Sequence, residues 1–63
     1  MNTPETMRAL KLAVTWKVRY ALEEGIFLSA AMHVEHVLME CLVPVSSEER
    51  TELMIAATAT RKI

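Results

Sequence analysis

The 63-residue chain is poor in the residues that small proteins use to reinforce a fold or to bind charged polymers. It contains one cysteine, one glycine, and one each of Trp, Tyr and Phe. Because Cys41 has no partner cysteine, an internal disulfide is excluded, which is typical of a reducing cytosolic compartment. Its seven basic and eight acidic residues lack the basic excess of nucleic-acid-binding domains. We therefore expect a cytoplasmic protein for which direct nucleic-acid binding is disfavoured.

Long uninterrupted apolar runs are absent as well. A transmembrane helix needs about 18 or more consecutive apolar residues. The longest candidate, residues 26–42, is interrupted by two histidines and two glutamates. Four basic residues interrupt the N-terminal stretch in which a signal peptide would have its apolar region. We expect neither a membrane span nor a signal peptide.

Sequence motifs for catalysis and cofactor binding are missing too. There is no nucleophile elbow, no glycine-rich phosphate loop and no carboxylate pair in an evident cleft. Cys41 is expected on an apolar helix face, directed toward the core, where thiols are usually inert. We expect a non-enzymatic protein without a cofactor.

The residues at the start of the chain predict a helix over residues 4–24. Thr3 can cap it, Pro4 suits the first helical position, where no N–H is needed, and Glu5 favours the positive end of the helix dipole. Nearly all the residues that follow are good helix formers. Gly25, the only glycine, stands where a left-handed residue would end the helix.

A second helix is predicted at about residues 29–42. Ser29 is a suitable N-cap. Pro44 ends the helix because proline disfavours helical geometry in the residue before it.

A capping box predicts the third helix at about residues 47–60, since Ser46 and Glu49 have the required spacing. Arg61 and Lys62 are expected beyond its end, where positive charge suits the helix dipole. Short connections favour antiparallel neighbouring helices. The sequence therefore predicts a single all-α domain over all 63 residues, a helical hairpin plus a third helix, completed by dimerisation.

The first helix carries apolar residues on more than one face. At about 100° per residue, the stripe expected to face the core contains Met7, Leu10, Val14, Val18 and Ala21. A second apolar stripe beside it contains Ala9, Ala13, Trp16 and Tyr20. The continuous polar strip is limited to Arg8, Lys11, Thr15, Arg19 and Glu23.

The second helix has even fewer polar residues. Its predicted core face contains Ala30, Ala31, Val34, Val37, Leu38 and Cys41. A further apolar surface contains Leu28, Met32, Met39 and Leu42. The predicted solvent-exposed strip is His33, His36 and Glu40, with Glu35 elsewhere. A helix that is apolar nearly all round is usually a buried helix.

This apolar surplus is the main functional information in the sequence. A chain of this length removes only about 60% of its unfolded surface from water when it folds alone. In one interpretation the third helix covers the other two, and the rest is ordinary exposed apolar surface. We favour a homodimer in which the first two helices pack against their symmetry mates. Trp16, Tyr20, Met32 and Met39 are the candidate interface residues, because Trp and Tyr are enriched at interface centres and Met adapts to irregular contacts.

Two polar groups in the sequence are candidate binding sites. His33, His36 and Glu40 share a helical face at spacings that can hold zinc or nickel. Three ligands on one face rarely complete a site, so a solvated polar face is the favoured interpretation and no metal is predicted.

Arg8, Lys11 and Arg19 line one side of the first helix and are the candidate contacts to a partner. An ordinary solvent face would look the same. In a DNA-binding helix-turn-helix motif, the recognition helix would be the second or the third helix. Either of these helices would bring carboxylates toward the DNA phosphates. A dimer that joins two basic strips remains the alternative, as a nucleic-acid-binding transcriptional regulator.

Taken whole, the chain resembles the short helical early protein of similar length from the exo–xis region of lambdoid bacteriophages. The resemblance extends from the Met1-Asn2-Thr3-Pro4-Glu5 opening to the Arg61-Lys62-Ile63 end, and includes 16–20 and 33–41. It implies expression in the cytoplasm of an infected bacterium and an accessory role in the lysis-versus-lysogeny decision or in host takeover. It implies no catalytic or ligand-binding residues. The resulting hypothesis is a small regulatory protein that contacts an unidentified host or phage protein.

Overall fold

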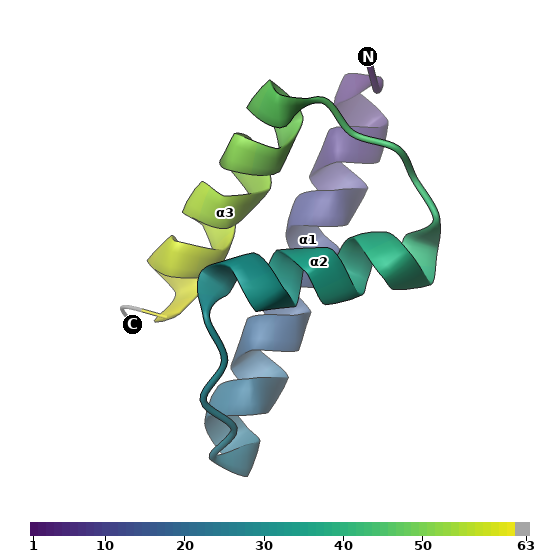
Figure 1. The fold of residues 1–63 in the computed structure, drawn as a ribbon. Helices are drawn as coiled ribbons and strands as arrows, with labels where there is room; N and C mark the ends of the chain where they lie inside the picture. The colour runs from purple at the N-terminus through teal and green to yellow at the C-terminus, as the bar shows by residue number, and fades with distance from the viewer. Residues whose placement is uncertain (62–63) are drawn as a thin grey trace.

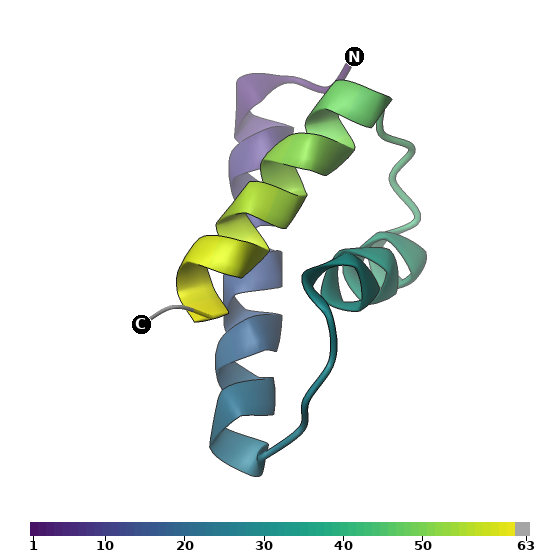
Figure 2. The same ribbon diagram turned by 60° about the vertical axis from the view of Figure 1, so that its left-hand side comes forward.

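A computed structural model describes residues 1–61, which form three helices: α1 (Pro4–Glu24), α2 (Ala30–Cys41) and α3 (Ser47–Arg61). The predicted all-α class is therefore confirmed. Figure 1 shows α1 and α3 running side by side in the same direction, with α2 crossing in front of α1. In Figure 2, α2 is seen nearly end-on beside α1. The chain thus turns α2 across α1, whereas a helical hairpin would lay it back along α1. None of the three helices is both long enough and apolar enough to cross a membrane.

Both ends of α1 have the predicted geometry. The side chain of Thr3 accepts a hydrogen bond from the backbone N–H of Thr6 at 3.2 Å. At the other end, Gly25 adopts a left-handed conformation with φ of 70°. The backbone N–H of Ile26 then donates to the carbonyl of Ala21 at 2.8 Å. This is the hydrogen bond that closes a glycine-terminated helix.

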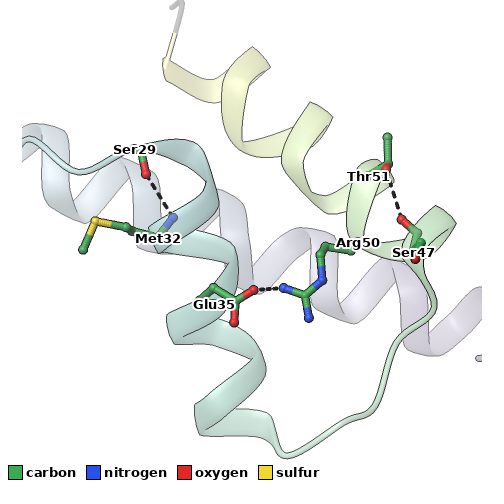
Figure 3. Close-up of polar contacts among 6 residues, drawn as sticks. All are labelled: Ser29, Met32, Glu35, Ser47, Arg50 and Thr51. Carbon is green, nitrogen blue, oxygen red and sulfur yellow. Dashed lines mark hydrogen bonds and ion pairs between the residues drawn. The ribbon is translucent and has the colours of Figure 1, made fainter.

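The ends of α2 are set by a serine and by an unusual leucine. Ser29 Oγ accepts from the backbone N–H of Met32 at 3.2 Å (Figure 3). The helix ends at Cys41, and Leu42 follows in the left-handed region with φ of 55°. Its N–H donates to the carbonyl of Leu38 at 2.9 Å. The same cap that Gly25 provides for α1 is thus made here by a residue with a side chain.

This difference predicts opposite effects of two substitutions. Left-handed geometry costs a residue with a Cβ about 1–2 kcal/mol, and the Leu42 side chain is 84% exposed, so little contact is lost without it. Leu42→Gly should therefore raise the free energy of unfolding by about 0.5 kcal/mol, after allowing for the extra freedom of glycine in the unfolded chain. Gly25→Ala should lower it by about 1 kcal/mol, although its Cβ would meet nothing within 4 Å. Urea unfolding would measure both, and equal or reversed signs would contradict the backbone argument.

The start of α3 is the predicted capping box. The backbone N–H of Ser46 donates to Glu49 Oε1 at 2.9 Å, and the N–H of Glu49 donates to Ser46 Oγ at 3.2 Å. The helix includes Arg61, which was predicted to lie just beyond it. Lys62, the other predicted basic residue, lies outside the described residues.

The carboxylate of Glu49 also accepts hydrogen bonds from the N-terminal residue Asn2. Glu49 is only 6% exposed, and Asn2 donates to it from the backbone at 2.7 Å and from the side chain at 3.2 Å. Asn2 also donates from Nδ2 to the carbonyl of Pro44 at 2.9 Å. The backbone N–H groups of Ser46 and Asn2 lower the pKa of Glu49 below its ordinary value of 4.5. One carboxylate thus joins the N-terminal residues, the linker before α3 and α3 itself.

The core lies where the three helices meet. Its members are Met7, Leu10, Val14 and Val18 of α1, Ala30, Val34 and Val37 of α2, and Leu53 and Ala57 of α3. The predicted core stripe of α1 is confirmed, including the buried Ala21. No residue of α3 was assigned to the core from sequence, yet Leu53 is fully buried. The sequence indicates the buried side of α3 through the i, i+4 and i+7 spacing of Leu53, Ala57 and Thr60.

The predicted core face of α2 is partly wrong. Ala31 and Cys41 are exposed, Leu38 is half-buried, and His33, predicted to be solvated, is only 3% exposed. The buried stripe is thus rotated toward His33. Because α2 crosses the bundle, its C-terminal end extends past α1 (Figure 1). The Cys41 thiol therefore does not reach the core.

Two ion pairs join α2 to its neighbours at the surface. Lys17 of α1 pairs with Glu40 of α2. Glu35 of α2 pairs with Arg50 of α3, and Figure 3 shows these two side chains directed toward each other. The hydrogen bond and the charge of Lys17 lower the pKa of Glu40 below its ordinary value. Exposed pairs of this kind contribute little to stability, so the crossing angle of α2 is determined mainly by the core.

Candidate interaction surfaces

The side of α1 that faces away from the bundle carries three large apolar side chains. Leu12, Trp16 and Tyr20, which we call the outer α1 face, are 58%, 61% and 60% exposed. Trp16 follows the fully buried Val14 by two residues, which places it about 200° further around the helix. The outer α1 face therefore lies opposite the core.

The second apolar stripe predicted for this helix is divided by the structure. Trp16 and Tyr20 belong to the outer α1 face, and Ala9 is also exposed. Ala13 is instead half-buried and packs against the core. Leu12, which was assigned to neither stripe, completes the face at the i, i+4, i+8 spacing with Trp16 and Tyr20. This spacing was visible in the sequence.

Arg19 lies over the indole ring of Trp16. Its guanidinium carbon is 6.0 Å from the ring centroid, which is within the range of a cation–π interaction. The two residues are three apart on α1, so the helix itself sets this geometry. At an exposed site such a contact is worth about 0.5–1 kcal/mol.

Met32 and Met39 form a second exposed surface, the outer α2 face. They are 46% and 70% exposed. Met32 precedes the buried Val34 by two residues and Met39 follows the buried Val37 by two, so both point away from the core. Glu35 lies between them and is also exposed.

All four predicted interface residues are thus exposed, but they do not form one patch. The outer α1 face points away from the bundle on one side and the outer α2 face on another, because α1 and α2 bury their opposite sides against each other and α3. This arrangement therefore does not support a single two-fold interface that includes both the outer α1 face and the outer α2 face.

A third exposed apolar site was not predicted. Phe27 is 89% exposed and Ile26 is 43% exposed, in the connection between α1 and α2. Leu22, at the end of α1, is 45% exposed. No role was predicted for this connection, although the Ile26-Phe27-Leu28 run after the helix end was a visible signal.

The predicted basic strip on α1 is split by its surroundings. Arg8 and Lys11 line an open cleft of about 680 Å³ whose other wall includes Glu48 and Glu52 of α3. Arg19 lies further along α1, over Trp16. Carboxylates opposite two of the three cations weaken their attraction for phosphate. The strip therefore offers a mixed surface, which favours a partner with both charges over a nucleic-acid backbone.

The histidine group is placed differently from its prediction as a solvated strip. His33 is buried, His36 is half-buried, and Glu40 is exposed and paired with Lys17. Within residues 1–61, no cluster of three or more His, Cys, Asp or Glu residues has the geometry of a metal site. The predicted position of His33 on a solvated strip is therefore wrong.

Burial gives His33 an unusual electrostatic environment. Its Nδ1 atom has no hydrogen-bond partner among the described residues. Desolvation lowers its pKa below the ordinary value of 6.5, and the positive charges of Arg61, His36 and Lys17 lower it further. These three groups come from α3, α2 and α1, so every helix opposes protonation of this imidazole.

Comparison of the chain with protein-family models, with curated protein sequences and with solved structures gave no match.

Proposed function

We propose that this chain is a small, non-enzymatic regulatory protein that acts through contacts with other protein chains, including a second copy of itself. The observation that carries the proposal is the outer α1 face, with Leu12, Trp16 and Tyr20 each more than half exposed. Trp and Tyr are the residue types that contribute most to binding energy at interface centres. These side chains lie opposite the core, so most of their apolar surface is available to a partner.

The outer α2 face gives the protein a second apolar surface. Met32 and Met39 are flexible and polarisable, which suits contacts with a partner of irregular shape. With two separate faces, a chain can contact two partners at once. Such a protein regulates by mass action, because it occupies a site on its partner in proportion to its concentration and affinity.

The resemblance to exo–xis early proteins supplies the biological setting of the proposal. In that setting the protein acts in the cytoplasm of an infected bacterium and influences phage development or host physiology. The mixed charges around Arg8 and Lys11 support a protein partner over the nucleic-acid alternative.

The proposal predicts that capture of a bacterial partner depends on a defined apolar face. Tagged wild-type protein, Trp16→Glu and the double variant Met32→Glu/Met39→Glu would be used as baits in bacterial lysate, with quantitative mass spectrometry of the captured proteins. Thr58→Glu is the matched control for Trp16→Glu, because it adds the same single charge at an exposed position of α3. We expect at least one protein to be captured by the wild type and the control and lost with one of the two face variants.

Two results would contradict the proposal. One is a set of captured proteins that is the same for all four baits, because binding would then not involve these faces. The other is tight binding to duplex DNA that weakens steeply between two salt concentrations, since that dependence identifies phosphate contacts. The second result would establish the nucleic-acid alternative.

A further inference from the structure

We infer that the outer α1 face is the self-association surface, on which a second copy of this chain packs its own α1 in the antiparallel direction. The inference rests on the proposed function and deepens it, because it assigns one of the two faces to one partner. The outer α2 face is then left free for a different protein. The order of apolar and charged residues along each face supports this assignment.

The outer α2 face is poorly suited to self-association. Glu35 lies midway between Met32 and Met39 on that face and is 52% exposed at its side chain. A two-fold axis that pairs the two methionines of one copy with those of another would bring the two Glu35 carboxylates together. Like charges directly opposite each other are destabilising, and Arg50 already forms an ion pair with Glu35 within the chain.

The outer α1 face, in contrast, is self-complementary in the spacing of its residues. Leu12 lies four residues before Trp16 and Tyr20 four residues after it, about 6 Å along the helix in each direction. When two such helices meet antiparallel at Trp16, each Leu12 contacts the Tyr20 of the second copy. The small Ala9 side chain, also exposed, allows the helices to approach closely. The same patch is used twice, as a two-fold interface requires.

The charges beside this face select the antiparallel direction. Arg8 lies eight residues before Trp16, and Glu23 lies seven residues after it. Both are exposed, and they lie about 60° apart around α1. Antiparallel pairing therefore places Arg8 within about 1.5 Å along the axis of the second copy's Glu23, twice in each dimer. Parallel pairing would place Arg8 on Arg8 and Glu23 on Glu23.

The size of the face sets the strength of the contact. Stable complexes bury about 800 Å² on each partner, which would be a large share of the 4469 Å² of surface that this chain exposes. One face of one helix supplies less than that. We therefore expect a dimer with a dissociation constant in the micromolar range, on the order of 1–100 μM.

Sedimentation equilibrium of the purified chain, from about 1 to about 500 μM, tests the inference. The wild type and Thr58→Glu should dimerise with the same constant. Trp16→Glu should weaken the dimer by about 100-fold, because it removes the central ring and brings two carboxylates together at the axis. Circular dichroism should show unchanged helicity, since Trp16 is 61% exposed and lies outside the buried core cluster.

Charge exchange then tests the direction. Arg8→Glu or Glu23→Arg alone should weaken the dimer by about tenfold at low salt, because each creates two like-charge pairs. The double variant should restore the wild-type constant, whereas a parallel dimer would show no such recovery. A monomer at every concentration, a dimer unaffected by Trp16→Glu, or a double variant no stronger than the single ones would each overturn the inference. None of these results bears on capture of a bacterial protein through the outer α2 face, so the two proposals can fail separately.

Discussion

Replacement of Leu53 by alanine is expected to lower the free energy of unfolding by about 2–5 kcal/mol. Leu53 is the largest of the fully buried side chains and lies in the cluster that joins all three helices. Truncation of a buried leucine costs about 2–5 kcal/mol. A chain of 63 residues has a total stability of only about 3–9 kcal/mol. The substitution therefore removes a large part of the free energy of unfolding.

Thermal unfolding followed by circular dichroism would measure this loss. Ile55→Ala is the matched control, since Ile55 lies two residues away on the same helix but is 63% exposed. We expect the control to change the free energy of unfolding by about 0.5 kcal/mol or less, as for most surface substitutions. If the Leu53→Ala protein had the same melting temperature as the Ile55→Ala control, α3 would not pack through Leu53.

Acidification below about pH 6.5 is expected to destabilise the fold through His33. In the folded chain burial lowers the pKa of His33, and Lys17, His36 and Arg61 lower it further, below the ordinary value of 6.5 that applies to the unfolded chain. As the pH falls through 6.5, the unfolded state therefore binds a proton before the folded state does. Stability is fully present above this pH and is lost progressively below it.

The same residue predicts a stabilising substitution. His33→Leu removes the unpartnered Nδ1 atom at similar volume, and leaving a polar atom buried without a partner costs about 1–3 kcal/mol. We expect a higher melting temperature at neutral pH and a smaller fall between neutral and mildly acidic pH. His36→Gln is the matched control, because it removes a half-buried histidine one turn away. If the pH dependence disappeared with His36→Gln and persisted with His33→Leu, the assignment to His33 would be wrong.

A separate loss is expected at lower pH through Glu49. Hydrogen bonds from the backbone of Ser46 and Asn2 hold its pKa below 4.5 in the folded chain. Its contribution is therefore complete above pH 4.5 and disappears as the pH falls through the lowered value. Glu49→Gln would remove this second step and leave the His33 step in place, which allows the two to be separated in one pH series.

Local signals in the sequence were sufficient to place the helices. As expected, α1 begins at Pro4 and is ended by Gly25, and α3 begins with a capping box formed by Ser46 and Glu49. These features act within a few residues, through hydrogen bonds and backbone geometry, so they can be read without knowing how the helices pack. The core stripe of α1 followed from its periodicity for the same reason.

The faces of α2 could not be predicted in the same way. Its residues are apolar nearly all round, so periodicity alone did not distinguish the side that faces the core from the side that faces away. His33 was assigned to solvent because it is polar, and Cys41 to the core because it is apolar. Both assignments failed, since the crossing of α2 over α1 determines which of its residues are covered.

The sequence by itself determined that this protein is a three-helix chain with more apolar surface than one small core covers. Only the tertiary structure decided how that surplus is divided. The packing of α2 and α3 on one side of α1 directs Leu12, Trp16 and Tyr20 outward, separates them from Met32 and Met39, and sets carboxylates of α3 opposite Arg8 and Lys11. Helix formation is controlled by neighbouring residues, whereas the direction of each face depends on contacts between residues far apart in the chain.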